Sequence, residues 1–530
     1  MESPNCFIRT CLVSMAVMAG ASTLSPAATA APSTEAPILR DSKTPLTPAQ
    51  HRQLNAHLTQ VAQAILAHVE LLPGQSRQGG VIAEMDLGTN MITVYFQRSF
   101  LPSERDALLL EDQLDAFRHA LTWEAWRSRA SSGVRYLWAG RPLYDYFPGI
   151  RAEDERAREI SEQASRSGSG SGVALVAAGH GFYFQRTSSK WALQRPLSFE
   201  IQEDFLTMDY AQELKQWIER RSQMPALRAR STSQDPHPAT GEAWWKFAAR
   251  YHLEQQYPQN PEIWNSLGAG SSNDHDYKED IRSRPLLANH QRAEFLVHLH
   301  TNAAGPAATG TRVIYQPGRE DGKRLAVSVL CYMKETIHAV EAYRDFTVNP
   351  QGEPSDKGEN RLAAMPSIIV ETAFHTNPTD ALALQDPAFR TAAMKGVEKG
   401  IRLFREGRDC QPFTSRPIAD LEVEHEGEAT TSAVFKGYPQ FPVTLTATNI
   451  ACPMGWNCRG GSWQDEEAIE SGLPLTSSCR NVTGTPGVIT WEIILKDADG
   501  VTTAPQRFSV TCNSSPRGGG SSAVPSAALS

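Results

Sequence analysis

The stretch Val173-Ala-Leu-Val-Ala-Ala-Gly-His-Gly181 is an apolar run that ends in a histidine between two glycines. The apolar part is too short for a helix, so residues 173–178 are predicted to form a buried strand. The two glycines allow the backbone to turn sharply where the strand ends. Because ligands of open α/β sheets bind outside the carboxyl ends of the strands, His180 is predicted to lie at a binding site.

The chain downstream of this strand alternates between strand-like and helix-like segments, a pattern typical of parallel α/β sheets. Further strands are predicted over residues 295–300 and 367–371, and helices over residues 203–220, 325–343 and 387–405. A long segment, residues 222–276, is predicted to be an insertion with a helical centre at residues 244–255. We therefore predict an α/β catalytic domain with a mostly parallel sheet over residues 173–408.

The segments on either side of this domain have different patterns. Residues 45–150 combine helical periodicity with short strand patterns and predict a small α+β accessory domain. Charged residues and a Gly/Ser run over residues 151–172 predict a linker. Residues 417–513 contain short alternating strands and turn signals, which favour an immunoglobulin-like β-sandwich that contains disulfides. The composition of residues 514–530 predicts a disordered tail.

Residues 1–30 have the pattern of an export signal. Arg9 is followed by a short apolar stretch, and Ala28-Thr29-Ala30 fits a small-residue cleavage site. We expect a signal peptide cleaved after Ala30, then a disordered leader over residues 31–44, and a secreted or periplasmic protein. No later apolar run approaches the ~20 residues of a membrane span, so no span is predicted.

Cysteine usage agrees with an exported protein. Of the eight cysteines, Cys6 and Cys11 lie in the predicted signal peptide. The others are even in number and predict disulfides: Cys331, Cys410, Cys452, Cys458, Cys479 and Cys512. We expect one bridge at the end of the catalytic domain and two in the C-terminal region.

Composition and charge exclude one class of partner. The chain is 40% hydrophobic and 21% charged over 530 residues, which is typical of a globular protein with several domains. Its formal net charge is -8 and no basic stripe stands out, so nucleic-acid binding is not expected.

Polar side chains that can bind a metal stand at the ends of predicted strands and at the start of a predicted helix. His180 and His300 each end a strand, Glu203 begins a helix, and Glu371 ends a third strand. Two imidazoles and one carboxylate are the protein ligands of catalytic zinc in several hydrolases. Zinc lowers the pKa of water and polarises the attacked carbonyl, while a further carboxylate transfers protons. His180, Glu203 and His300 are therefore the predicted Zn²⁺ ligands, and Glu371 is the predicted base.

Residues 173–404 resemble the zinc-dependent N-acetylmuramoyl-L-alanine amidase family. The resemblance rests on four motifs in the family's order: Ala178-Gly-His-Gly181, Glu203-Asp-Phe-Leu-Thr-Met-Asp-Tyr-Ala211, Ala293-Glu-Phe-Leu-Val-His-Leu-His-Thr-Asn-Ala303, and Pro366-Ser-Ile-Ile-Val-Glu-Thr-Ala-Phe-His-Thr-Asn-Pro-Thr-Asp380. It implies hydrolysis of the amide between the lactyl group of N-acetylmuramic acid and L-alanine in peptidoglycan. It also allows for a regulatory protein partner.

Some residues depart from the family's pattern or have a simpler interpretation. The family usually has serine where His298 stands and aspartate where Asn302 stands. His298 points to the same face as His300, so it is expected near the cleft without reaching the same metal. Taken alone, Glu203 also fits an acid that offsets a helix dipole. Three other histidines are expected in loops or at the surface: His275, His290 and His375.

Two other functions are compatible with parts of this pattern. A zinc peptidase that cuts the stem peptide would use the same ligands and base. A non-catalytic protein that binds the cell wall would use the terminal domains and keep the centre as a scaffold. The four motifs in order favour the amidase over both.

Overall fold

The computed structural model describes residues 46–126, 131–165, 172–467, 472–480, 486–513 and 526–529. The predicted signal peptide and leader lie outside these residues, as do parts of the predicted linker and most of the predicted tail. Among the helices that are described, none is long and apolar enough to cross a membrane.

The N-terminal region is an α+β structure, as the sequence predicts. Its three-stranded sheet has the order β1-β2-β3, with β1 and β2 antiparallel and β2 and β3 parallel. Helix α1 begins with a capping box, in which the side chains of Thr47 and Gln50 each accept a hydrogen bond from the other's backbone N–H. The elements are α1 (Pro48–His68), β1 (Val81–Met85), β2 (Met91–Phe96), α2 (Leu110–Trp126), β3 (Gly133–Trp138) and α3 (Pro148–Ser165).

A six-stranded sheet forms the core of the central region of the chain, and its mostly parallel character is confirmed. The strand order is β10-β9-β11-β8-β4-β7, and only the β11–β9 pair among these strands is antiparallel. The strands are β4 (Ala174–Ala178), β7 (Ala226–Arg228), β8 (Phe295–Asn302), β9 (Arg312–Tyr315), β10 (Glu353–Pro354) and β11 (Ser367–Phe374). A two-stranded ribbon, β5 (Tyr183–Gln185) and β6 (Lys190–Ala192), follows β4.

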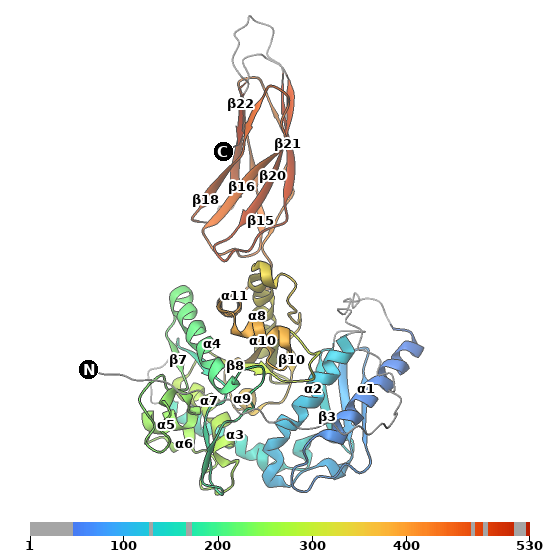
Figure 1. Ribbon diagram of the computed structural model, residues 1–530, viewed down its shortest axis with the longest axis vertical. Helices are drawn as coiled ribbons and strands as arrows, with labels where there is room; N and C mark the ends of the chain where they lie inside the picture. The colour runs from blue at the N-terminus through green and yellow to red at the C-terminus, as the bar shows by residue number, and fades with distance from the viewer. Residues whose placement is uncertain are drawn as a thin grey trace, which may run out of the picture. The chain divides into compact units, whose positions relative to one another are not determined.

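Helices cover both faces of the central sheet because its strands are apolar on both sides. Val176 of β4 faces a core built with α4, α8 and α11, whereas Leu175 faces a second core built with α5, α6 and α7. Helices α8 and α11 lie side by side (Figure 1). The helices are α4 (Glu203–Trp217), α5 (Ala249–Gln256), α6 (Pro261–Trp264), α7 (His275–Gln291), α8 (Glu320–His338), α9 (Gly358–Arg361), α10 (Pro378–Gln385) and α11 (Pro387–Arg405).

The central elements differ from the sequence prediction mainly at their ends. Strands β8 and β11 run past His300 and Glu371, to Asn302 and Phe374. The predicted insertion, residues 222–276, contributes β7 to the edge of the central sheet, so part of it belongs to the domain's framework. Its aromatic residues pack with those of the β5–β6 ribbon in a small core around Phe247.

The C-terminal region is rich in β-strands. Its strands form a five-stranded sheet, β13-β21-β20-β16-β18, and a four-stranded sheet, β14-β19-β22-β17. Alternate residues of β20 are buried, among them Trp491, as in a strand with one face on a core. The elements are β12 (Thr414–Ser415), β13 (Leu421–Val423), β14 (Glu428–Ala433), β15 (Phe435–Lys436), β16 (Val443–Ala451), β17 (Asn457–Arg459), β18 (Gly461–Asp465), β19 (Leu473–Arg480), β20 (Gly487–Lys496), β21 (Gln506–Cys512) and β22 (Ser526–Leu529).

Three disulfides join the six cysteines, which confirms the predicted division. Cys331–Cys410 ties α8 to the chain beyond α11. The two bridges in the C-terminal region are Cys452–Cys458 and Cys479–Cys512.

Candidate metal centre

The first candidate ligand, His180, lies in a sharp backbone turn between two glycines, Gly179 and Gly181. His180 has a φ of 65° and Gly181 a φ of 123°, both in the left-handed region that glycine favours. A Cβ added to Gly179 would lie 2.2 Å from Cε1 of His300, so this glycine lets the two imidazoles approach each other. The turn after β4 therefore presents His180 to the end of β8.

The second candidate ligand, Glu203, is the first residue of α4 and is buried. Its Oε1 accepts a hydrogen bond from the backbone N–H of Thr301, at 2.9 Å. The next residue, Asp204, accepts hydrogen bonds from the backbone N–H groups of Gly181, Gln194 and Arg195, at 2.8, 2.9 and 3.1 Å. The start of α4 thus positions one ligand and fixes the loop that carries another.

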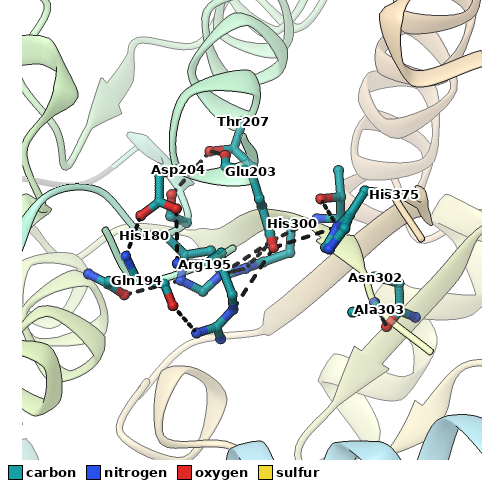
Figure 2. A network of polar contacts seen from close by, with 12 residues as sticks. His180, Gln194, Arg195, Glu203, Asp204, Thr207, His300, Asn302, Ala303 and His375 are labelled. Atoms are coloured by element: carbon teal, nitrogen blue, oxygen red, sulfur yellow. Dashed lines mark hydrogen bonds and ion pairs between the residues drawn. The ribbon is translucent and has the colours of Figure 1, made fainter. Parts of the chain in front are cut away.

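His300 completes the group from β8. Its Nδ1 lies 3.0 Å from Nε2 of His180 and 3.3 Å from Oε1 of Glu203. Nε2 of His180 lies 3.2 Å from the same carboxylate oxygen. Figure 2 shows the three side chains pointing toward one another. The structure therefore brings the three predicted ligands together, and their ligand atoms all lie within 4.8 Å of one another.

Glu371 lies beside this group because β11 and β8 are neighbouring parallel strands. Glu371 and His300 are partners in their register. Glu371 is 8% exposed, and its Oε2 has no hydrogen-bond partner among the described residues. Together with His180 and His300 it lines a cavity of about 60 Å³. An unpartnered carboxylate oxygen in such a cavity is available to water or substrate.

Charged neighbours change the proton affinities at the site. Burial acts to raise the pKa of Glu203, but His180 and His300 outweigh it and hold this pKa well below its usual range. Burial acts to lower the pKa of His300, but Glu359 and Glu203 raise it to about 10. Burial raises the pKa of Glu371 to about 8, against the opposing effects of His300 and Arg118. The cluster therefore favours a positive charge where the three ligand atoms meet.

The chemistry of these residues fits a divalent cation such as zinc. Two imidazole nitrogens and one carboxylate oxygen converge, as in catalytic zinc sites with three protein ligands. The carboxylate of Glu203 is ionised and buried, and such a charge is stable only beside a counter-charge. The further carboxylate, Glu371, is close without belonging to the group of three.

Other histidines lie differently from the expectation. His298 is fully buried beneath His300, and in the described part of the chain neither of its ring nitrogens has a hydrogen-bond partner. His275 is buried at the start of α7, so the expectation of a loop or surface position is wrong for it, whereas His375 lies in the turn after β11 but is buried. Nδ1 of His375 lies 2.8 Å from Oγ1 of Thr301, one residue from a ligand, whereas His275 contacts Asp276. His290 is partly buried in the last turn of α7.

Helix α2 of the N-terminal region closes one side of the cavity, a contact that the sequence did not predict. Asp112 of α2 lies 3.2 Å from Arg195, and Asp115 lies 2.7 Å from Nζ of Lys357. Both acids line the cavity, as do both basic residues.

Comparison with known proteins identifies one family. Residues 175–402 match the model of the family described as N-acetylmuramoyl-L-alanine amidase. No similar protein was found among the curated proteins.

Several solved structures resemble part of the chain. The CwlD amidase from Clostridioides difficile, in complex with the GerS lipoprotein, is 16% identical and covers 45% of this chain and 100% of its own, with a TM-score of 0.31. The catalytic domain of CwlV, an N-acetylmuramoyl-L-alanine amidase from Bacillus (Paenibacillus) polymyxa var. colistinus, is 14% identical over 44% of this chain and 99% of its own, with a TM-score of 0.30. The N-acetylmuramyl-L-alanine amidase Ami1 from Mycobacterium smegmatis is 13% identical over 46% of this chain and 100% of its own, with a TM-score of 0.30.

Proposed function

We propose that the central region of the chain, which matches the N-acetylmuramoyl-L-alanine amidase family over residues 175–402, uses zinc to hydrolyse the amide between the lactyl group of N-acetylmuramic acid and L-alanine in peptidoglycan. His180, Glu203 and His300 hold the ion in this proposal, and Glu371 is the catalytic base. The observation that carries it is the convergence of those three side chains beside Glu371, a buried carboxylate whose Oε2 has no hydrogen-bond partner among the described residues.

Each residue has a defined part in the reaction. Zinc, when bound, supplies a Lewis acid that polarises the amide carbonyl and makes water a better nucleophile. Glu371 takes a proton from the water that attacks the carbonyl carbon. The C–N bond then breaks, and Glu371 returns a proton to the leaving nitrogen. The products are a carboxylic acid on the lactyl group and a free α-amino group on L-alanine.

A digest of purified peptidoglycan tests the reaction. Mass spectrometry should find stem peptides with a free amino-terminal alanine, and a chelator should stop their release until zinc is returned. Products in which a shortened peptide stays joined to muramic acid would instead identify a peptidase. Release of no fragment by the zinc-loaded protein would favour a non-catalytic wall-binding protein.

Substitution of Glu371 tests its role in the same digest. Glu371→Gln removes the base and keeps the shape, so the rate should fall by at least ~10²-fold while zinc stays bound. Elemental analysis of the purified variant checks the zinc content. Turnover at the wild-type rate would contradict the assignment.

We also propose where the protein acts and how it is divided. Its disulfides and its family indicate a protein outside the cytoplasm. A signal peptide cleaved after Ala30 and a secreted or periplasmic location are the finer proposal. The proposal also divides the chain into domains over residues 45–150, 173–408 and 417–513. We further propose that the last of these domains is an immunoglobulin-like sandwich, because its core contains Trp491 and the Cys479–Cys512 bridge.

The small volume of the cavity is relevant to a regulatory protein partner. A cavity of about 60 Å³ holds a few water molecules, whereas a glycan with its stem peptide is far larger. Displacement of α2, which lines the cavity, would widen the access of peptidoglycan to Glu371. A partner that binds the N-terminal region in its displaced position would activate the enzyme, and this is the role that we propose for it.

A further inference from the structure

The two ligand histidines face the proposed metal site with different ring nitrogens. His180 presents Nε2 and His300 presents Nδ1, since these are the atoms that lie 3.0 Å apart and beside Oε1 of Glu203. A neutral imidazole binds a metal only through the nitrogen that carries no hydrogen. His180 must therefore carry its hydrogen on Nδ1 and His300 on Nε2, and each needs an acceptor on its outer side.

The structure supplies both acceptors. Nδ1 of His180 lies 3.1 Å from Oε1 of Gln194, a contact that Figure 2 also shows. Nε2 of His300 lies 3.2 Å from Oε1 of Glu359. Glu359 is 7% exposed and comes from the short helix α9, which is far from both histidines in the sequence.

These two acceptors are joined behind the site by a continuous series of polar contacts. Nε2 of Gln194 donates to Oδ2 of Asp280, at 3.1 Å. Nη2 of Arg284 donates to the same oxygen, also at 3.1 Å, and Nη1 of Arg284 donates to Glu359. Asp280 and Arg284 are fully buried, one helical turn apart on α7. The backbone N–H of Ala249 donates to the other oxygen of Asp280, at 2.7 Å.

The charges of three of these side chains stabilise this arrangement of contacts. Asp280 and Glu359 bring two negative charges and Arg284 one positive charge, so one negative charge remains close to the ligands. The guanidinium can only donate, which forces both carboxylates to accept. An ionised Asp280 can only accept, so the amide N–H₂ of Gln194 points to Asp280 and its oxygen points to His180.

We propose that Gln194 and Glu359, oriented by Asp280 and Arg284, are positioning residues that fix the tautomer and ring orientation of the two metal-binding histidines. This inference rests on the proposed zinc site. Partners of this kind typically contribute 10- to 100-fold to metal affinity, so the four residues should determine how tightly zinc is held.

Zinc affinity of the full chain, measured by competition with a chromophoric chelator, tests the proposal. Glu359→Gln should weaken zinc binding about tenfold and Glu359→Ala by up to about a hundredfold. Gln194→Ala removes the hydrogen-bond acceptor of His180 and should weaken zinc binding about tenfold. Gln194 is only partly buried, so this variant tests the idea even if Glu359→Ala does not fold.

Glu353→Gln is the matched control. Glu353 is as buried as Glu359 and pairs with two arginines, Arg118 and Arg312, but it touches none of the ligands. Its substitution should lower the melting temperature and leave zinc affinity within twofold of the wild type. The absorption spectrum of the cobalt-substituted protein should change for the variants at Glu359 and Gln194 and stay the same for Glu353→Gln.

The outcomes separate this proposal from the proposed function. If folded Glu359→Ala and Gln194→Ala bind zinc as tightly as the wild type, the positioning role is wrong and the zinc site stands. If the wild-type chain itself binds no zinc, the zinc site fails and the positioning role fails with it.

Discussion

Glu371 combines two properties that seldom occur together in a carboxylate. It is buried, and one of its oxygens has no hydrogen-bond partner in the described part of the chain. Burial raises its pKa to about 8, so near neutral pH the metal-free protein holds a proton that the unfolded chain has released. The folded state therefore becomes less stable as the pH rises toward that pKa.

Glu371→Gln should remove this pH dependence. The cost of ionising Glu371 is absent below the ordinary pKa of a glutamate, grows between about pH 4.5 and 8, and is complete above that. The metal-free variant should therefore gain on the order of a few kcal/mol over the metal-free wild type between pH 5 and pH 8. Urea denaturation of both proteins at several pH values measures the difference. A difference that is the same at every pH would contradict the raised pKa.

The residues proposed as metal ligands and as the base were predictable from the sequence, whereas the residues that contact them were not. His180, His300 and Glu371 follow apolar runs, and a buried strand with a polar end is visible in the sequence. Glu359 and Gln194 stand in irregular segments with no such pattern, and only the fold brings them to the histidines. The burial of His375 could not be predicted because its partner, Thr301, lies on another strand.

At the scale of elements, two glycines set the distance between α8 and α11. A Cβ on Gly396 would lie 2.5 Å from Cα of Met333, and one on Gly400 would lie 2.6 Å from Cα of Val329. Both contacts are with backbone atoms of α8, which cannot turn away. The glycines therefore allow the two helices to pack closely against one face of the central sheet.

Gly400→Ala should lower the stability of the protein although alanine favours helices. The added methyl group forces the helices apart, at a cost of ~1–3 kcal/mol that exceeds the ~1 kcal/mol gain in helix propensity. Val327→Ala is the control, since Val327 lies on the exposed side of α8 and its loss should change the free energy of unfolding by under ~0.5 kcal/mol. A more stable Gly400→Ala variant in thermal denaturation would show that the helices can separate freely.

Long apolar strands and helices with a clear apolar face were predictable, and short strands were not. β4, β8 and β11 are buried along their whole length and rich in apolar residues, which the sequence shows directly. β7 and β10 have three and two residues, and their strand character comes from pairing with neighbours in the sheet. The order of strands in the sheet likewise depends on packing that no local pattern encodes.

At the scale of the whole molecule, α2 connects the N-terminal region to the site. Its acids, Asp112 and Asp115, pair with basic residues that line the cavity. The sequence separates Asp115 from Lys357 by more than two hundred residues, and nothing in either segment indicates the pairing. The interpretation of residues 45–150 as a separate accessory domain therefore missed this contact.

Reversing these charges should open the cavity. In the Asp112→Lys/Asp115→Lys variant, lysines face Arg195 and Lys357, and the repulsion should displace α2. Hydrolysis of intact peptidoglycan should become about tenfold faster for each ~1.4 kcal/mol lost from the closed arrangement. Asp145→Lys, a change of the same sign at an exposed position of the same region, should leave the rate unchanged. An unchanged or lower rate in the double variant, with zinc retained, would contradict the closing role of α2.

The Cys331–Cys410 bridge encloses part of the active site within a covalent loop. Glu359 and Glu371 lie inside this loop of 79 residues, whereas His180, Glu203 and His300 lie outside it. Closing a loop of that length removes conformational freedom from the unfolded chain worth about 4–5 kcal/mol at 25 °C. A chain kept under reducing conditions loses this restraint on the segment that carries Glu359 and Glu371. Formation of the bridge thus favours the ordered arrangement of the segment that places Glu359 and Glu371 beside His300.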